Sequence, residues 1–381
     1  MTTRQKNAIV LTLAVFATVL ALYFLEKNRS PSAPGGARVL DAVPADTFLL
    51  ATFDVGPLRA SPLMEPLRSL SAGMGKDVRS QCGFDPLERL DTVAVALPES
   101  DGIGDFGVVS VGSLKKDELL KCARTVMQAR SANLAAHDVS GFTVVEDKGT
   151  FGGAYGKLAV RDFGPFLLAR EPWISSMIEA WEKKRPRIES NARHMDLRRS
   201  LGTPRGASTN EPARAKPAVL VTALLPAKLR ERLKREMSTE GTAGSNAAML
   251  GVLGVESAGI AVTIDAAGMI DLAAELRCET VQACLDVEHL IAKKRDEWAG
   301  DFRMRLIGLG GILQGLTVEA KGPQVSSHTR IAADDARRLI DRLLELRAGA
   351  HAGSNVVPVT SATSGMSGPQ PAPPDKDAGA R

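Results

Sequence analysis

Aromatic residues are scarce in this chain of 381 residues. Three Trp, two Tyr and eleven Phe make up only 4% of it. A folded core must therefore rest mainly on Ala, Val, Leu and Ile, which the 44% hydrophobic fraction allows. The net charge of +4 is too small to predict a nucleic-acid partner. The most basic stretch, residues 183–235, also has no aromatic side chain on which bases could stack.

Recognisable catalytic motifs are missing as well. Ser113 and Lys116 have the Ser-x-x-Lys spacing, but the companion Ser-Asp-Asn and Lys-Thr-Gly motifs do not occur. The glycine-rich stretch 149–157 lacks the opening glycine and the final hydroxyl residue of a phosphate-binding loop. The five histidines are scattered singly, and none forms a His-Glu-x-x-His motif. The sequence therefore predicts no catalytic residue, no cofactor and no metal site.

One long apolar run, Ala8–Leu25, has eighteen residues without a charge, and Arg4 and Lys6 precede it. About 20 apolar residues span the hydrocarbon core of a membrane as a helix. We therefore expect a retained transmembrane anchor. The alternatives are a secretory signal cleaved after Ala21 and a buried helix of a soluble protein. Positive charge before the run favours a cytoplasmic N-terminus, which predicts a single-pass inner-membrane protein with most of its chain outside the cytoplasm.

The chain has four cysteines and no Cys-x-x-Cys pair. An even number of cysteines in an oxidising compartment favours disulfides. We predict Cys82–Cys122 and Cys278–Cys284, because each pair places a helix cysteine against the loop or strand end that precedes it. Free buried thiols and metal ligation are the alternatives.

Strand and helix patterns occur in the same order in two parts of the chain. The helix cysteines Cys122 and Cys284 are 162 residues apart, as are Gly107 and Met269, which begin the preceding strands. The sequence therefore predicts an α+β fold with an internal duplication, in which two ferredoxin-like units each form an antiparallel sheet with helices. The predicted segments are a cytoplasmic tail (1–7), the transmembrane anchor (8–25), a flexible stalk (26–38), a first unit (39–184), a basic linker (185–216), a second unit (217–347) and a disordered tail (348–381).

Fifteen basic and four acidic residues lie between Lys183 and Arg235, a net charge of +11. The start of this stretch is polar and rich in Pro, Gly and Ser, so we expect its side chains not to pack. Lys183, Lys184, Arg185 and Arg187 are the candidates for contact with anionic lipid or an acidic envelope polymer. The alternative interpretation is a solvated linker.

Together these patterns predict a bacterial, membrane-anchored extracytoplasmic protein with a binding or envelope-organising role. Its expected partner is the membrane, through the N-terminal helix, and no nucleic acid is expected. Two other classes remain open: an envelope hydrolase whose site is assembled from scattered residues, and an accessory subunit of a secretion or transport complex. A deep cleft with converging ionisable groups would favour the hydrolase. A large exposed apolar patch would favour the subunit.

Overall fold

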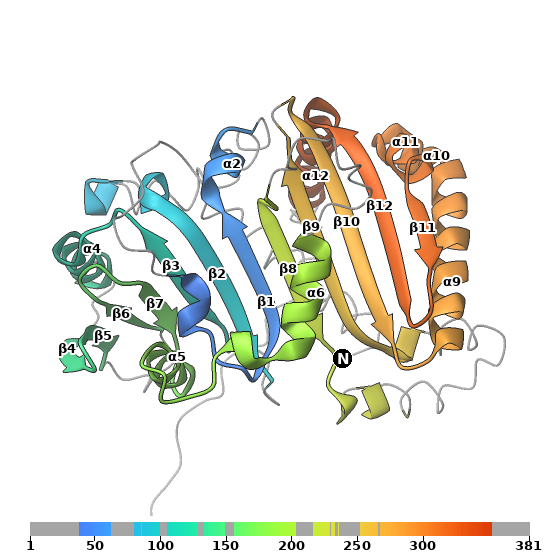
Figure 1. The fold of residues 1–381 in the computed structure, drawn as a ribbon. Coiled ribbons are helices and arrows are strands. Elements are labelled where there is room, and N and C mark those ends of the chain that lie inside the picture. The colour runs from blue at the N-terminus through green and yellow to red at the C-terminus, as the bar shows by residue number, and fades with distance from the viewer. Residues whose placement is uncertain are drawn as a thin grey trace, which may run out of the picture. The chain divides into compact units, whose positions relative to one another are not determined.

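The computed structural model contains one antiparallel sheet of twelve strands (Figure 1). Its strand order is β11-β12-β10-β9-β8-β1-β2-β3-β7-β6-β5-β4. The described residues are 38–61, 80–84, 86–99, 105–128, 133–148, 156–202, 216–228, 230–232, 235, 252–265 and 267–352. Residues up to Arg342 form one compact unit, and residues from Leu343 onward form a second.

The strands are four to ten residues long. Their bounds are β1 (Thr47–Asp54), β2 (Leu90–Pro98), β3 (Gly107–Gly112), β4 (Leu134–Val139), β5 (Phe142–Asp147), β6 (Lys157–Val160), β7 (Phe166–Ala169), β8 (Val219–Leu224), β9 (Val255–Ile264), β10 (Met269–Cys278), β11 (Thr317–Ala320) and β12 (Gln324–Ala332).

Helices alternate with these strands along the chain and pack on the sheet. Their bounds are η1 (Val39–Ala42), α2 (Val55–Arg59), η2 (Pro86–Arg89), α4 (Lys116–Gln128), α5 (Trp173–Trp181), η3 (Ile188–Ser190), α6 (Ala192–Gly202), α9 (Val281–Gly300), α10 (Phe302–Leu306), α11 (Leu309–Gln314) and α12 (Ala333–Ala352). None of the described helices has the length and apolar character of a membrane span.

The prediction of two ferredoxin-like units is wrong, because the strands of both halves belong to one sheet. Each half begins with three neighbouring antiparallel strands, β1-β2-β3 and β8-β9-β10, and a cysteine-bearing helix follows each set. The halves join where β1 pairs with β8, from Leu49 opposite Ala223 to Phe53 opposite Val219. An unpaired strand edge exposes a row of backbone donors and acceptors, and the β1–β8 pairing satisfies both edges inside the fold.

The central strands are buried on both faces, which explains their nearly continuous apolar sequences. On one face, Phe53 of β1 packs in a cluster with Val219 of β8 and Ile264 of β9, and Ile340 of α12 lies against it. On the other face, Leu50 of β1 belongs to a cluster with residues of η1, α5 and η3. Side chains in a strand alternate between its faces, so β1 supplies both cores.

The predicted basic linker is partly ordered. Residues 188–190 form η3 and residues 192–202 form α6, while 203–215 lie outside the described residues. Leu197 and Leu201 of α6 pack against Ala261 of β9, with Leu220 and Ala273 beside them. This helix has few apolar residues and a weakly amphipathic sequence, so its burial comes from the sheet beneath it rather than from a strong local pattern.

Both predicted disulfides are present. Cys82 is bonded to Cys122 of α4, and Cys278 at the end of β10 is bonded to Cys284 of α9. The side chains of Cys278 and Cys284 are buried in a cluster with Val255, Val287 and Val325, so the second bridge ties α9 to the sheet. The predicted cytoplasmic tail, the predicted anchor and most of the predicted stalk (residues 1–37) lie outside the described residues, as do residues 353–381 of the predicted tail.

Candidate functional site

Three large apolar side chains are exposed at the end of α9 and along α10. The exposed fractions are 49% for Trp298, 72% for Phe302 and 64% for Leu306. Phe302 and Leu306 are four residues apart in α10, the interval that places helical side chains on one face. Trp298 lies near the end of α9, and the extended residue Asp301 separates the two helices. We call the three exposed residues the apolar ridge. Scattered exposed apolar residues are normal, but three together in a chain with so few aromatics indicate a surface that contacts something.

Hydrogen bonds to the backbone hold the ridge in place. Asp301 ends α9, and its carboxylate accepts a hydrogen bond from the Met304 backbone N–H at 3.2 Å at the start of α10. Arg305 Nη2 donates to the Gly300 carbonyl at 3.2 Å, and Arg342 Nη1 donates to the Leu306 carbonyl at 2.7 Å. The bond from Met304 satisfies a backbone N–H at the start of α10, and the two arginine bonds satisfy carbonyls that helix ends leave open. The ridge is therefore already ordered before any partner arrives, which lowers the entropic cost of binding.

Charged residues surround the ridge. Residues 293–305 contain five basic and three acidic residues, a net charge of +2. Lys294 Nζ donates to Glu297 Oε2 at 2.6 Å, and this hydrogen bond lowers the pKa of Glu297. Arg295 Nε donates to Asp296 Oδ1 at 2.8 Å, which lowers the pKa of Asp296. Both acids are therefore ionised at neutral pH and neutralise part, but not all, of the positive charge.

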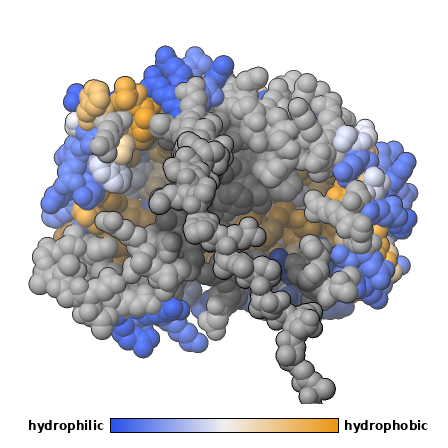
Figure 2. All heavy atoms as spheres, turned by 180° about the vertical axis from the view of Figure 1, so that it is seen from behind, coloured by the Kyte–Doolittle hydropathy of each residue, from blue (hydrophilic) through white to orange (hydrophobic). Residues whose placement is uncertain are grey.

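The surface seen from behind agrees with this arrangement (Figure 2). Hydrophobic side chains gather over the corner where α10 and α11 lie in Figure 1, and hydrophilic side chains flank them. An apolar patch with a polar rim is typical of a docking surface.

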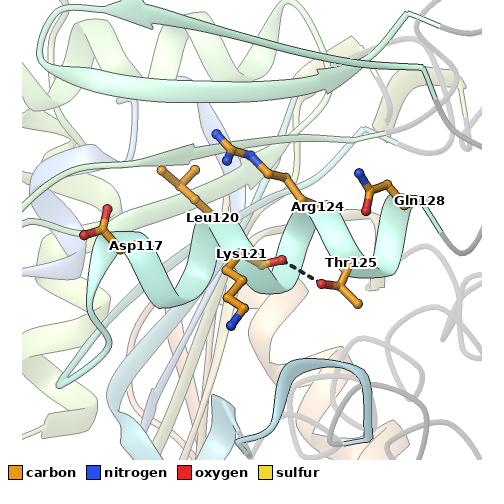
Figure 3. Close-up of a pocket in the computed structure, with 6 residues that line it drawn as sticks. All are labelled: Asp117, Leu120, Lys121, Arg124, Thr125 and Gln128. Carbon is orange, nitrogen blue, oxygen red and sulfur yellow. Dashed lines mark hydrogen bonds between the residues drawn. The ribbon is translucent and has the colours of Figure 1, made fainter.

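A hollow of about 380 Å³ beside α4 is the alternative candidate site (Figure 3). It is lined by Asp117, Leu120, Lys121, Arg124, Thr125 and Gln128. Thr125 uses its hydroxyl to donate to the Lys121 carbonyl of its own helix at 3.0 Å. Among the described residues, all of the lining groups come from α4. Catalysis needs groups that converge from several directions, so this hollow does not favour the hydrolase.

A buried polar cluster lies between α6 and the sheet. His194 is fully buried, and its Nδ1 and Nε2 lie 2.9 Å from the Thr222 hydroxyl and the Thr47 carbonyl. Arg198 Nη2 donates to the Thr52 hydroxyl at 2.6 Å, and burial lowers the pKa of Arg198 to about 10. These polar groups bond to other parts of the same fold, so the cluster fixes α6 on the sheet and does not offer a reactive group.

Glu275 on β10 is also fully buried, and it extends the polar cluster. Its carboxylate accepts hydrogen bonds from the Ser200 hydroxyl at 2.5 Å and from Arg277 Nε at 3.1 Å. A buried carboxylate is tolerated when it is hydrogen-bonded and close to a positive charge. Ser200 belongs to α6, so this pair ties the helix to β10 and also has a structural role.

The four basic residues predicted to contact an anionic surface are partly engaged within the fold. Arg187 Nη1 bonds to Asp41 at 3.0 Å, and its Nε and Nη2 donate to the carbonyls of Ala180 and Trp181 at 2.8 and 2.6 Å. Arg185 bonds to Asp46 and to Ser176. Lys183 and Lys184 are exposed, and Lys184 pairs with Glu182. The expectation that none of the four packs is wrong for Arg185 and Arg187, because these side chains cover carbonyls and acids left open around the end of α5.

The ridge was not among the residues predicted from the sequence to form a site. Trp298, Phe302 and Leu306 carry a visible four-residue spacing, but the same spacing is typical of side chains that face a core. A single sequence does not distinguish an exposed apolar stripe from a buried one. The adjacent cations, Lys293, Lys294 and Arg295, were the only hint that this stripe meets water.

Comparison with known proteins yields little. No known protein family matches the sequence, and no curated protein matches it. Solved structures similar to this chain include crystal forms I and III of a protein called TP0453. Form I is 11% identical, covers 81% of this chain and 98% of its own, and has a TM-score of 0.41. Form III is 12% identical, covers 80% and 98%, and has a TM-score of 0.44. Likeness at these scores carries no inference about this chain.

Proposed function

We propose that this chain is a membrane-tethered module that works outside the cytoplasm and binds a partner through the apolar ridge. The observation that carries the proposal is the ridge itself, Trp298, Phe302 and Leu306, exposed on a backbone that is already ordered. Apolar side chains held in water cost free energy, and a docking role accounts for that cost.

Two further observations support the proposed location outside the cytoplasm, which we call the address. Both disulfides suit an oxidising compartment, because thiols in the cytosol are kept reduced. The uncharged run 8–25, with basic residues before it, supports a tether whose N-terminus stays in the cytoplasm. The rest of the chain then follows the tether across the membrane.

The address can be tested in cells that express the full chain. Thiols are trapped at lysis with a maleimide that adds a visible mass, with and without prior reduction. We expect no modification before reduction and four modified cysteines after it. In membranes from the same cells, the chain should stay in the pellet after a carbonate wash. Protease added to spheroplasts should degrade the chain. Four free thiols, or a chain recovered in the soluble fraction, would reject the proposed address.

The binding role has its own test. The double variant Phe302→Ser, Leu306→Ser removes most of the ridge without touching a buried residue. We expect the double variant to keep the melting temperature of the wild type. It should lose any cross-links between the ridge and a protein partner that the wild type forms in cells, or else the lipid contact described below. Phe163→Ser is the matched control, because Phe163 is 97% exposed in a different half of the sheet. An unchanged pattern of contacts in the double variant would contradict a docking role for the ridge.

A further inference from the structure

The ridge is small for a contact between proteins. At their exposed fractions, the three side chains offer on the order of 400 Å² of surface. A stable protein interface buries about 800 Å² on each partner. A second copy of this chain, or the accessory-subunit role considered from the sequence, would have to bury the whole ridge together with about as much polar surface around it. A bilayer surface needs less, because each apolar side chain can enter it separately.

The chemistry of the segment suits the boundary between water and lipid. Tryptophan favours the headgroup level of a membrane, where one part of its ring is apolar and the other is hydrated. Phe302 and Leu306 are exposed on one face of α10, the next helix along the chain, and can reach the acyl chains. Lys293 and Lys294 are exposed one turn before Trp298, and the net charge of +2 in residues 293–305 complements anionic headgroups.

A tether makes such a small contact sufficient. If residues 8–25 hold the chain at a membrane, docking of the ridge becomes an intramolecular step with a high effective concentration. We infer that the apolar ridge Trp298–Phe302–Leu306 inserts into the surface of the anionic bilayer to which the chain is anchored. This inference rests on the proposed function, because it names the partner of the same ridge.

Trp298 supplies a direct probe of insertion. The other tryptophans, Trp173 and Trp181, pack in the core on the α5 side of the sheet. The full chain is reconstituted into vesicles of phosphatidylcholine and phosphatidylglycerol, with ordinary or brominated acyl chains. Bromine quenches tryptophan only at close contact, so quenching reports a ring within the bilayer. We expect quenching in the wild type, and we expect Trp298→Phe to lose it.

Variants that leave Trp298 in place test the rest of the ridge. Phe302→Ser, Leu306→Ser should lose most of the quenching, and the control Phe163→Ser should keep it. Vesicles of phosphatidylcholine alone should give less quenching than vesicles with phosphatidylglycerol, and Lys293→Gln should reduce that difference. Equal emission in brominated and ordinary vesicles would overturn the inference. Zero-length cross-links between the ridges of two copies of the chain, found without any quenching, would overturn the inference and indicate that a second copy is the partner.

The tether and the ridge can fail separately. A chain that resists carbonate but shows no quenching keeps the proposed address and rejects insertion of the ridge. If tryptophan fluorescence is quenched in brominated vesicles but a carbonate wash releases the chain from the membrane, insertion of the ridge is supported and the tether is rejected. Absence of both signals rejects both.

Discussion

His194 shows how a single buried side chain makes stability depend on pH. The Thr47 carbonyl can only accept, so Nε2 of His194 carries the proton and Nδ1 accepts from the Thr222 hydroxyl. Burial lowers the pKa of His194, chiefly because the charged ring would lose its water. The unfolded chain takes up this proton near pH ~6.5, while the folded chain does not until a lower pH.

We therefore expect stability to fall as the pH drops from ~6.5 toward the folded pKa of His194, with a slope approaching about 1.4 kcal/mol per pH unit. Above pH ~6.5 both states are neutral at this residue, and it contributes no slope. Urea midpoints between about pH 7 and about pH 5 measure the effect. His194→Gln should lower the midpoint at neutral pH and flatten the slope. His289→Gln, at an exposed position of α9, should leave the slope unchanged. Equal slopes in wild type and His194→Gln would refute the assignment.

Arg187 is a second residue whose role comes from its contacts rather than from its charge. Its guanidinium joins Asp41 to two carbonyls near the end of α5. We expect Arg187→Gln to lower the free energy of unfolding by about 1–3 kcal/mol, the usual cost of losing hydrogen bonds to a charged group. Lys184→Gln removes an equal charge from a side chain that is 64% exposed, so it should change stability by less than about 0.5 kcal/mol. Chemical unfolding of both variants measures the two changes in the free energy of unfolding. Identical losses of stability would mean that only net charge matters.

At the scale of elements, α6 depends on a glycine beneath it. A Cβ at Gly259 of β9 would meet Leu201 Cδ1 at 2.5 Å and Leu197 Cδ2 at 3.1 Å. Glycine therefore allows the helix to lie close to the strand, and the polar bonds of His194 and Arg198 require that closeness. Gly259→Val should destabilise the protein by about 1–3 kcal/mol through overpacking.

Amide hydrogen exchange in α6 should also become faster in Gly259→Val, because the helix would lift from the sheet. Gly202→Ala is the matched control at the end of α6. Nothing lies within 4 Å of the Cβ it would add. We expect it to be neutral or to stabilise by about 0.5–1 kcal/mol, since alanine loses less backbone entropy than glycine in a helix. Unchanged exchange in Gly259→Val would contradict the proposed contact.

At the scale of the whole molecule, the sheet couples the two halves of the chain. β1 pairs with β2 of its own half and with β8 of the other. Helix α6 precedes β8 in the sequence, yet it packs on β8 and β9 of the second half. Residues to Arg342 form one compact unit as a result. We predict that the oxidised protein unfolds in a single transition, with equal calorimetric and van't Hoff enthalpies.

A chain cut after residue 202 tests this coupling. It would leave the edge of β1 unpaired and the apolar side of α6 without its strands, so we expect it to aggregate or to melt well below the full chain. Two separable transitions in the full chain, or a stable fragment of residues 38–202, would show that the halves fold independently.

Local patterns in the sequence were sufficient for several features. The apolar, β-favouring run 48–55 predicts a strand, and the observed β1 is Thr47–Asp54. The stretch 280–298 predicts a long helix, and the observed α9 is Val281–Gly300. The pairing of Cys278 with Cys284 follows from the same reasoning, since the two residues are separated by one turn between a strand and a helix. These features depend on neighbours within a few residues, and such interactions are written in the local order of side chains.

Other features depend on residues far apart in the chain, and only the tertiary structure decided them. β1 and β8 are both apolar strands, and nothing local specifies that they share an edge. The sequence of α6 is polar and predicts a linker. In the structure, hydrogen bonds from His194 and Arg198 to the sheet hold this segment as a packed helix. The stripe of Trp298, Phe302 and Leu306 has the spacing of a buried face, yet it is exposed. Burial is a property of what lies opposite a side chain, and a single sequence does not state what lies there.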